Sequence, residues 1–397
     1  METQNNTIES LGITPKNFEN LPTPEQMRRE RIEAGNAYPK SENTDLKVAK
    51  IVNTLSTRQL VETVYTTQLS KHGLCQNEPM ESYLESNCIS SGDICEVNRS
   101  GIHYVFNKSE EKNNLDKFRD TSHFDLGTFA HMAFLEPKLF STVEVEPSYP
   151  LSAHDGVNAL IEFYQGLLLK ALGEGMRFEM PPFAEYEAYK IADKKEYLQG
   201  LKDANPYTMI DEKHKIIIDI ISRNYYEYAG GLIPKLLAGS MNETSFYYSD
   251  EESGLEIKVR PDALLFEENI GINAVVSFKT TRAESVEKYL YDAASLKYHV
   301  KEAAYQHVVS KVSGRDFNTT IMIMLQTVPP YLPAVMVLDD ADMEASRHEM
   351  EIGMDKIRES QMGKKPLGFE TLAEEGNMGI ITPKFPSWIS KAIQDTI

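Results

Sequence analysis

Residues 255–281 contain three side chains whose types and spacing suit chemistry on a phosphate group. Asp262 follows a segment of alternating apolar and polar residues, and Ser277 and Lys279 lie two positions apart in the next apolar segment. Residues two apart in a strand share a face, so we expect Asp262, Ser277 and Lys279 to converge at the edge of one small sheet. A carboxylate there would hold Mg2+, and a lysine would stabilise negative charge on a phosphate.

Two strands and one long helix must position these side chains. The alternation over residues 255–259 predicts a strand with one buried face, and Pro261 ends its regular pattern. A polar turn over 267–271 leads towards a second strand over 273–279. After this strand, one uninterrupted helix is predicted over 282–313.

The arrangement of these motifs resembles the PD-(D/E)xK nuclease superfamily. A Pro-Asp pair ends at Asp262, and the segment 277–279 stands where (D/E)xK belongs. A further motif around His131, G-T-x-x-H-x-x-x-L-E-P, is similar to the helix that opens the nuclease domain in the RecE-like exonuclease branch. The resemblance implies an α+β (α/β/α-like) fold of the restriction-endonuclease-like type, with a small mixed β-sheet flanked by helices.

The resemblance also implies roles for individual residues in a metal site. His131, Asp262 and Glu243 are expected as ligands of Mg2+ or Mn2+. Asp262 and Lys279 are expected to be catalytic, with Ser277 at the position of the missing acid. Such a site would hydrolyse a phosphodiester with the help of the metal ion.

Contacts to DNA are expected from the long helix and from the end of the second strand. The RecB-like branch carries a QxxxY motif on this helix, and the best register puts Lys301 at the glutamine and Tyr305 at the tyrosine, with Gln306 one place late. A lysine preserves charge at that position but loses the geometry of the amide. The residues expected to contact DNA are Tyr305, Lys301, Thr280 and Arg282.

Ser277 departs from the superfamily motif, because a hard cation prefers a charged oxygen ligand to a neutral hydroxyl. Three explanations remain open from the sequence. The acid has been replaced deliberately to trap substrate, the protein is a natural nuclease relative without activity, or another acid has moved into the site. The candidates for such a replacement are Glu267, Glu268 and Glu284.

The chain divides into three predicted parts. Residues 1–44 are rich in Asn, Pro, Thr and Glu and predict a flexible arm. Residues 45–90 predict a helical extension, and packing on the domain is favoured over partner binding or oligomerisation. Residues 91–397 form the predicted nuclease-like domain, with a helical insertion at about 150–240.

The composition combines an acidic total with a locally basic site. The 397 residues include 60 Asp and Glu against 41 Lys and Arg, a net charge of -19. This balance disfavours a nucleic-acid partner at face value, but screening makes the local charge more important than the total. The expected site is basic, with five cations in one segment: Lys279, Arg282, Lys288, Lys297 and Lys301.

Several classes of protein are disfavoured by features that the sequence lacks. Cys75, Cys88 and Cys95 predict neither a disulfide framework nor the four ligands of an iron-sulfur cluster. The sequence shows no phosphate-binding glycine loop, so we expect no nucleotide cofactor. We see no apolar run of about 18 residues and no secretion signal, so we expect no membrane partner and a cytoplasmic location.

The function implied by the resemblance is a metal-dependent DNA exonuclease that resects duplex ends for phage-type recombination in a bacterial host. Its expected partners are double-stranded DNA ends, a single-strand annealing protein and further copies of the chain in a homo-oligomer. The alternative is a catalytically inactive nuclease-fold protein that binds DNA or serves in assembly. Chance matches in an unrelated α/β protein would instead leave His131, Asp262 and Lys279 far apart.

Overall fold

A computed structural model of the protein describes residues 44–61, 64–69, 72–116, 122–179, 186 and 189–383. The flexible arm predicted for residues 1–44 lies outside this part of the chain, apart from Thr44, which begins the first described helix. No helix within the described residues is long and apolar enough to cross a membrane.

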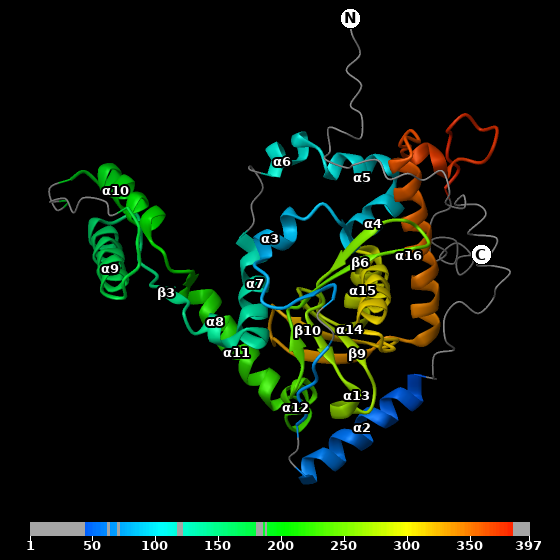
Figure 1. The fold of residues 1–397 in the computed structure, drawn as a ribbon. Helices are drawn as coiled ribbons and strands as arrows, with labels where there is room; N and C mark the ends of the chain where they lie inside the picture. Colours follow the sequence, from blue (N-terminus) through cyan, green and yellow to red (C-terminus); the bar gives the residue numbers. More distant parts are fainter. Residues whose placement is uncertain are drawn as a thin grey trace, which may run out of the picture.

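A five-stranded mixed sheet forms the centre of the molecule (Figure 1). Its strands in chain order are β5 (Met241–Asn242), β8 (Ala263–Leu265), β9 (Ala274–Thr281), β10 (Thr320–Gln326) and β11 (Pro333–Val337). They lie side by side in the order β11-β10-β9-β8-β5, with β9 and β10 parallel and the other pairs antiparallel. The apolar, β-branched sequence of β9 suits a central strand that is buried on both faces.

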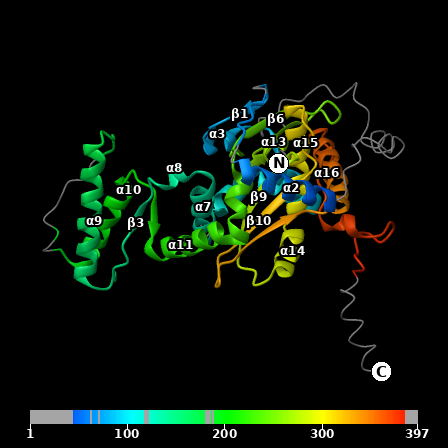
Figure 2. The ribbon, with the colours of Figure 1, turned by 90° about the horizontal axis from the view of Figure 1, so that it is seen from below.

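Helices cover both faces of this sheet, as Figures 1 and 2 show. One group packs with the even-numbered residues of β9 and the other packs with Val275, so successive side chains of this strand enter two different hydrophobic cores. Ser277 and Lys279 therefore leave the strand on the face of Val275. The first group contains α7 (Ser122–Leu135) and α11 (Glu212–Glu227), and the second contains α4 (Ser91–Arg99), α15 (Tyr298–Ser313) and α16 (Asp340–Gln361).

A smaller sheet extends the α15 side of the molecule. It contains β1 (Leu74–Cys75), β2 (Ile89–Ser90), β6 (Ser245–Ser249) and β7 (Glu256–Val259) in the order β1-β6-β7-β2. The predicted strand over 255–259 is thus present, and its apolar residues are buried. Lys258, expected on a solvent face, is also buried, because its ammonium group donates to the carbonyls of Tyr83 at 2.5 Å and Ser86 at 2.7 Å.

The helix predicted over 282–313 is interrupted. Two helices, α14 (Val286–Ser295) and α15, are separated by Lys297 in the left-handed conformation with φ of 58°. The sequence at this break holds neither glycine nor proline, but a tertiary contact holds the break: the Lys297 ammonium lies 2.7 Å from the carboxylate of Glu349 on α16. The break changes the direction of the chain before it passes the site.

A helical lobe projects from the main body (Figures 1 and 2). Its two long helices, α9 (His154–Gly173) and α10 (Ile191–Ala204), share a hydrophobic core of their own. Two parallel strands that the sequence did not predict, β3 (Glu144–Glu146) and β4 (Met209–Asp211), join the lobe to the body. The lobe thus leaves and rejoins the body at neighbouring points.

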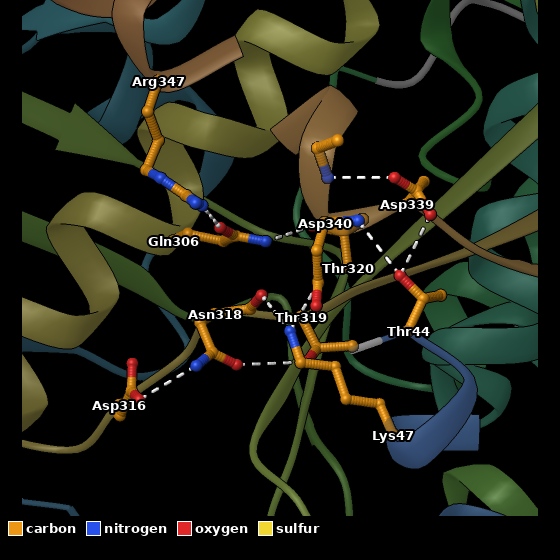
Figure 3. A network of polar contacts seen from close by, with 11 residues as sticks. Thr44, Lys47, Gln306, Asp316, Asn318, Thr319, Thr320, Asp339, Asp340 and Arg347 are labelled. Carbon is orange, nitrogen blue, oxygen red and sulfur yellow. Dashed lines mark hydrogen bonds and ion pairs between the residues drawn. The ribbon is translucent and has the colours of Figure 1, made fainter. Parts of the chain in front are cut away.

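The first described helix, α2 (Thr44–Val61), packs on the domain, as the sequence favoured. Figure 3 shows the polar network at its start. The buried ammonium group of Lys47 donates to the backbone carbonyl of Asn318 at 3.1 Å and to the carboxylate of Asp340 at 2.6 Å. This network ties α2 to the loop before β10 and to the start of α16.

Short elements complete the described chain. The polar turn expected at 267–271 is instead a helical turn that ends at Gly271, where φ of 84° suits glycine. The short helices are α3 (Met80–Glu85), α5 (Gly101–Asn107), α6 (Glu110–Asp116), α8 (Pro137–Phe140), α12 (Leu232–Leu237), α13 (Glu267–Ile270), η4 (Tyr228–Gly230) and η5 (Phe369–Leu372).

Candidate metal centre and active site

Three expected ligands, His131, Glu243 and Asp262, form a cluster at the edge of the central sheet. One ligand atom from each residue lies within 4.8 Å of the others. The Nδ1 atom of His131 is 3.8 Å from Glu243 Oε1 and 3.8 Å from Asp262 Oδ1. The side chains come from α7, from the link between β5 and β6, and from the link between β7 and β8, so the cluster depends on the tertiary fold.

Asp262 is held by the strand that carries the lysine. Its Oδ2 atom accepts a hydrogen bond of 2.6 Å from the backbone N–H of Phe278. The same oxygen lies 3.3 Å from the Lys279 ammonium group. Its other oxygen, Oδ1, is the atom directed at His131. The two oxygens of the Asp262 carboxylate therefore face different groups.

Glu243 is positioned by an unusual backbone conformation. Its φ of 45° lies in the left-handed region, which is uncommon for a residue with a side chain and often occurs at functional sites. Its backbone N–H donates to the carbonyl of Asp262 at 3.1 Å. The Arg260 guanidinium donates to Glu243 Oε2 at 3.1 Å, which leaves Oε1 directed at His131.

His131 reaches the cluster because α7 packs closely on β9. A Cβ atom at Gly127, one helical turn before His131, would lie 3.0 Å from Thr280 Oγ1, so this contact favours glycine. The edge of the imidazole packs against the Phe278 ring with centroids 6.2 Å apart. Burial disfavours the charged form of His131, but the nearby carboxylates of Glu243 and Asp262 outweigh it and raise its pKa.

Lys279 and Lys301 share an aromatic neighbour. Their ammonium groups lie 5.6 Å and 5.5 Å from the centre of the Tyr298 ring. Burial alone would lower the pKa of Lys279, but the nearby charges of Asp262 and Glu302 raise it. Lys279 therefore stays protonated beside the acidic cluster, as a group that stabilises negative charge must.

The comparisons with known proteins show the family of the chain. A family described as "PDDEXK-like domain of unknown function (DUF3799)" matches residues 97–368. The chain belongs to this PDDEXK-like family. The superfamily and the α+β fold class predicted from the sequence are thereby confirmed.

Solved structures give weaker similarity. A crystal structure of a candidate exonuclease from Eubacterium rectale is 16% identical with a TM-score of 0.31, over 59% of this chain and 91% of that chain. A crystal structure of the protein SSO0001 is 14% identical with a TM-score of 0.20, over 57% of this chain and 85% of that chain. No curated protein sequence matches the chain.

The motif position that distinguishes this PDDEXK-like chain is fully buried. Ser277 is 0% exposed, and its hydroxyl makes no hydrogen bond of ordinary geometry to any described residue. The three candidate replacement acids, Glu267, Glu268 and Glu284, are not part of the cluster of His131, Glu243 and Asp262. Glu268 instead forms a two-point ion pair with Arg315 at 3.0 and 2.8 Å, and Glu284 is exposed.

Glu302, on α15, is an acid of the site that the sequence reasoning missed. Burial raises its pKa to about 7, against the opposing effects of the Lys279 ammonium group and the Ser277 hydroxyl. It is 0% exposed and approaches Ser277 without reaching hydrogen-bond geometry. Helical spacing could have revealed it, because Glu302 lies four residues after Tyr298 and four before Gln306, on a largely buried stretch of α15.

The expected DNA contacts are only partly gathered at the site. Tyr305 lies near it: burial, and then the charges of Glu302 and Asp262, raise the pKa of its phenol well above the usual value. Thr280 packs under Gly127, and Arg282 is exposed beyond the buried part of β9. Gln306 points away, since it donates to Thr320 at 3.1 Å and accepts from Arg347 at 3.1 Å (Figure 3).

The predicted basic character of the site is reduced by pairing. Lys288 forms an ion pair with Asp292 one turn later on α14, and Lys297 is paired with Glu349. Lys279 lies between acids. Of the other two expected cations, Lys301 lies over the Tyr298 ring and Arg282 is exposed.

The cluster fits a divalent metal ion. Two carboxylates and one imidazole suit Mn2+, and the carboxylates suit Mg2+. Each carboxylate also has a fixed partner, Arg260 for Glu243 and Phe278 N–H for Asp262, which orients the ligand oxygens as outer partners do in metal sites.

Proposed function

We propose that the protein is a divalent-metal-dependent DNA exonuclease of the RecE-like type, which resects duplex ends. The observation that carries this proposal is the cluster of His131, Glu243 and Asp262 with Lys279 3.3 Å from Asp262. Membership of the PDDEXK-like family supports nuclease ancestry. Phage-type recombination, an annealing partner, a homo-oligomer and a cytoplasmic location belong to the same proposal.

The side chains have distinct roles in this reaction. His131, Glu243 and Asp262 hold the ion, which when bound polarises the phosphate and acidifies a water molecule. Lys279 stabilises the charge that develops on the phosphate oxygens. Tyr305, Lys301, Thr280 and Arg282 contact the DNA strand, with Lys301 acting as a point charge.

A blunt linear duplex with labelled ends and a closed circular duplex of the same sequence test the proposal. With Mn2+ or Mg2+, we expect nucleotides to be released from the linear DNA only. Asp262→Asn should reduce release at least about 100-fold, whereas Glu268→Gln, a carboxylate paired outside the cluster, should not. Cutting of the closed circle would instead indicate endonuclease activity and would contradict the proposed exonuclease.

Ser277 favours a second candidate, a nuclease-fold protein that binds DNA or serves in assembly without cutting it. The residue offers a hydroxyl where the superfamily motif has an acid. This candidate predicts that the duplex binds equally well with and without Mn2+ and stays intact. If the unmodified chain binds the duplex but does not cleave it, this second candidate would be favoured over the exonuclease.

A further inference from the structure

Glu302 is an acid placed where the fold gives it no ordinary partner. The residue is 0% exposed, and neither carboxylate oxygen makes a hydrogen bond to a described residue. An ionised carboxylate removed from water is strongly disfavoured unless a cation or several donors offset the loss. Packing alone therefore does not explain a glutamate at this position of α15.

Ser277 lies at the same place and likewise makes no hydrogen bond of ordinary geometry to a described residue. Its hydroxyl is buried on the face of β9 that α15 covers, and it approaches Glu302 closely enough to stabilise the carboxylate. Buried polar groups in proteins are nearly always paired. Two neighbouring exceptions at the motif position indicate a functional role for this contact between β9 and α15.

The charges around Glu302 are of both signs. Three carboxylates, those of Glu243, Asp262 and Glu302, lie near three permanent cations, Lys279, Arg260 and Lys301. Lys279 interacts with both Asp262 and Glu302, so its single positive charge is shared between the two carboxylates. A divalent cation at the cluster would add two positive charges, which the Glu302 carboxylate would help to offset.

We propose that Glu302 supplies the negative charge that the superfamily motif places at position 277, so that helix α15 replaces strand β9 as the source of this acid. Glu302 lies outside the group of three ligand atoms that are within 4.8 Å of one another. We therefore assign it the charge of the missing acid and not a direct bond to the ion. The chemistry of this role rests on the proposed nuclease function.

Calorimetric titration of the full chain with Mn2+ alone tests this role. Glu302→Gln keeps the size of the side chain and removes its charge, so we expect Mn2+ affinity to fall about 10- to 100-fold. The matched control is Glu268→Gln, the same substitution at an acid paired with Arg315, and it should leave the affinity within about twofold of the unmodified chain.

A compensating substitution separates this role from a structural one. Ser277→Asp should add little to the unmodified chain, because Glu302 already provides the charge. In the Glu302→Gln background, Ser277→Asp should restore most of the lost Mn2+ affinity, which makes the two substitutions strongly non-additive. A glutamate that only balanced Lys279 would give no such recovery, and its loss would change the melting temperature without changing the affinity.

The outcomes also separate this inference from the proposed function. Unchanged Mn2+ affinity in folded Glu302→Gln, or additive effects of the two substitutions, would overturn the role of Glu302. Should Glu302→Gln fail to fold, a Ser277→Asp gain of 100-fold in the unmodified chain would overturn it equally, and a small gain would support it. Glu302-dependent Mn2+ binding by a chain that leaves duplex ends uncut would uphold the inference and refute the exonuclease.

Discussion

The carboxylate of Asp262, just before β8, accepts a hydrogen bond of 2.6 Å from the backbone N–H of Phe278 in β9. This bond fixes the distance between Asp262 and the segment 277–279. Because Lys279 is the next residue after Phe278, the same bond also brings its ammonium group within 3.3 Å of the carboxylate.

Two substitutions of Asp262 should separate its chemical role from its structural one. Asp262→Asn keeps an oxygen that accepts from Phe278 N–H, so stability should change little while Mn2+-dependent cleavage falls at least about 100-fold. Asp262→Ala removes this acceptor and should lower the free energy of unfolding by a further amount of about 1–3 kcal/mol. Urea unfolding and an end-labelled cleavage assay measure the two effects. Equal stability of both variants would contradict the role of the hydrogen bond.

Gly127→Ala should displace His131 although it improves the helix. Alanine favours a helix by about 1 kcal/mol over glycine, but its Cβ would lie 3.0 Å from Thr280 Oγ1 and push α7 away from β9. We expect at least about a tenfold loss of cleavage, because small misplacements of catalytic groups are costly. When Thr280→Ala is added to Gly127→Ala, cleavage should return to the level of Thr280→Ala alone. A double variant that stays below that level would exclude the steric explanation.

Acid should weaken the fold through Asp250, which joins the β6–β7 turn to α15. Burial would raise its pKa, but hydrogen bonds from His307 and Ser253 lower it. A carboxyl with a lower pKa in the folded state stabilises the fold above its unfolded-state pKa of about 3.9, and this contribution is lost as pH falls through the folded pKa.

The melting temperature as a function of pH tests this contribution. In Asp250→Asn the group no longer titrates, so the fall in melting temperature below about pH 4 should be shallower than in the unmodified chain. Parallel curves for the two proteins would show that other carboxyl groups cause the loss of stability in acid.

Lys47→Met should detach α2 at its first turn. The substitution leaves Asp340 without its 2.6 Å partner at a largely buried position, and we expect a loss of about 1–3 kcal/mol in unfolding free energy. Lys215→Met is the matched control: the Lys215–Asp219 pair is also 2.6 Å long but more exposed, so its loss should cost less than about 1 kcal/mol. Equal losses would show that burial does not strengthen the Lys47 contact.

The sequence was most informative where local pattern and chemistry coincide. Alternation predicted the strands around Asp262 and Lys279, and the motif around His131 predicted the helix that supplies the imidazole. Helical spacing places Glu302 on the buried stretch of α15, but its nearness to Ser277 depends on how α15 packs on β9, and no local pattern encodes that contact.

The break at Lys297 and the burial of Lys258 escaped for a similar reason. The partners that stabilise them, the Glu349 carboxylate and the carbonyls near Tyr83, are distant in the chain. Propensity and periodicity describe neighbours in sequence, so both features were expected to follow local rules and instead follow tertiary contacts.

The parallel pairing of Glu144–Glu146 with Met209–Asp211 has a consequence for evolution and engineering. Because the two connections to the helical lobe lie side by side, the chain between them can lengthen or shorten without moving either connection. The buried apolar residues of the lobe form a hydrophobic core of their own. The segment between β3 and β4 is therefore a natural place for relatives to diverge in length, and a site where a foreign domain could be grafted while the part of the molecule that carries His131, Glu243 and Asp262 keeps its shape.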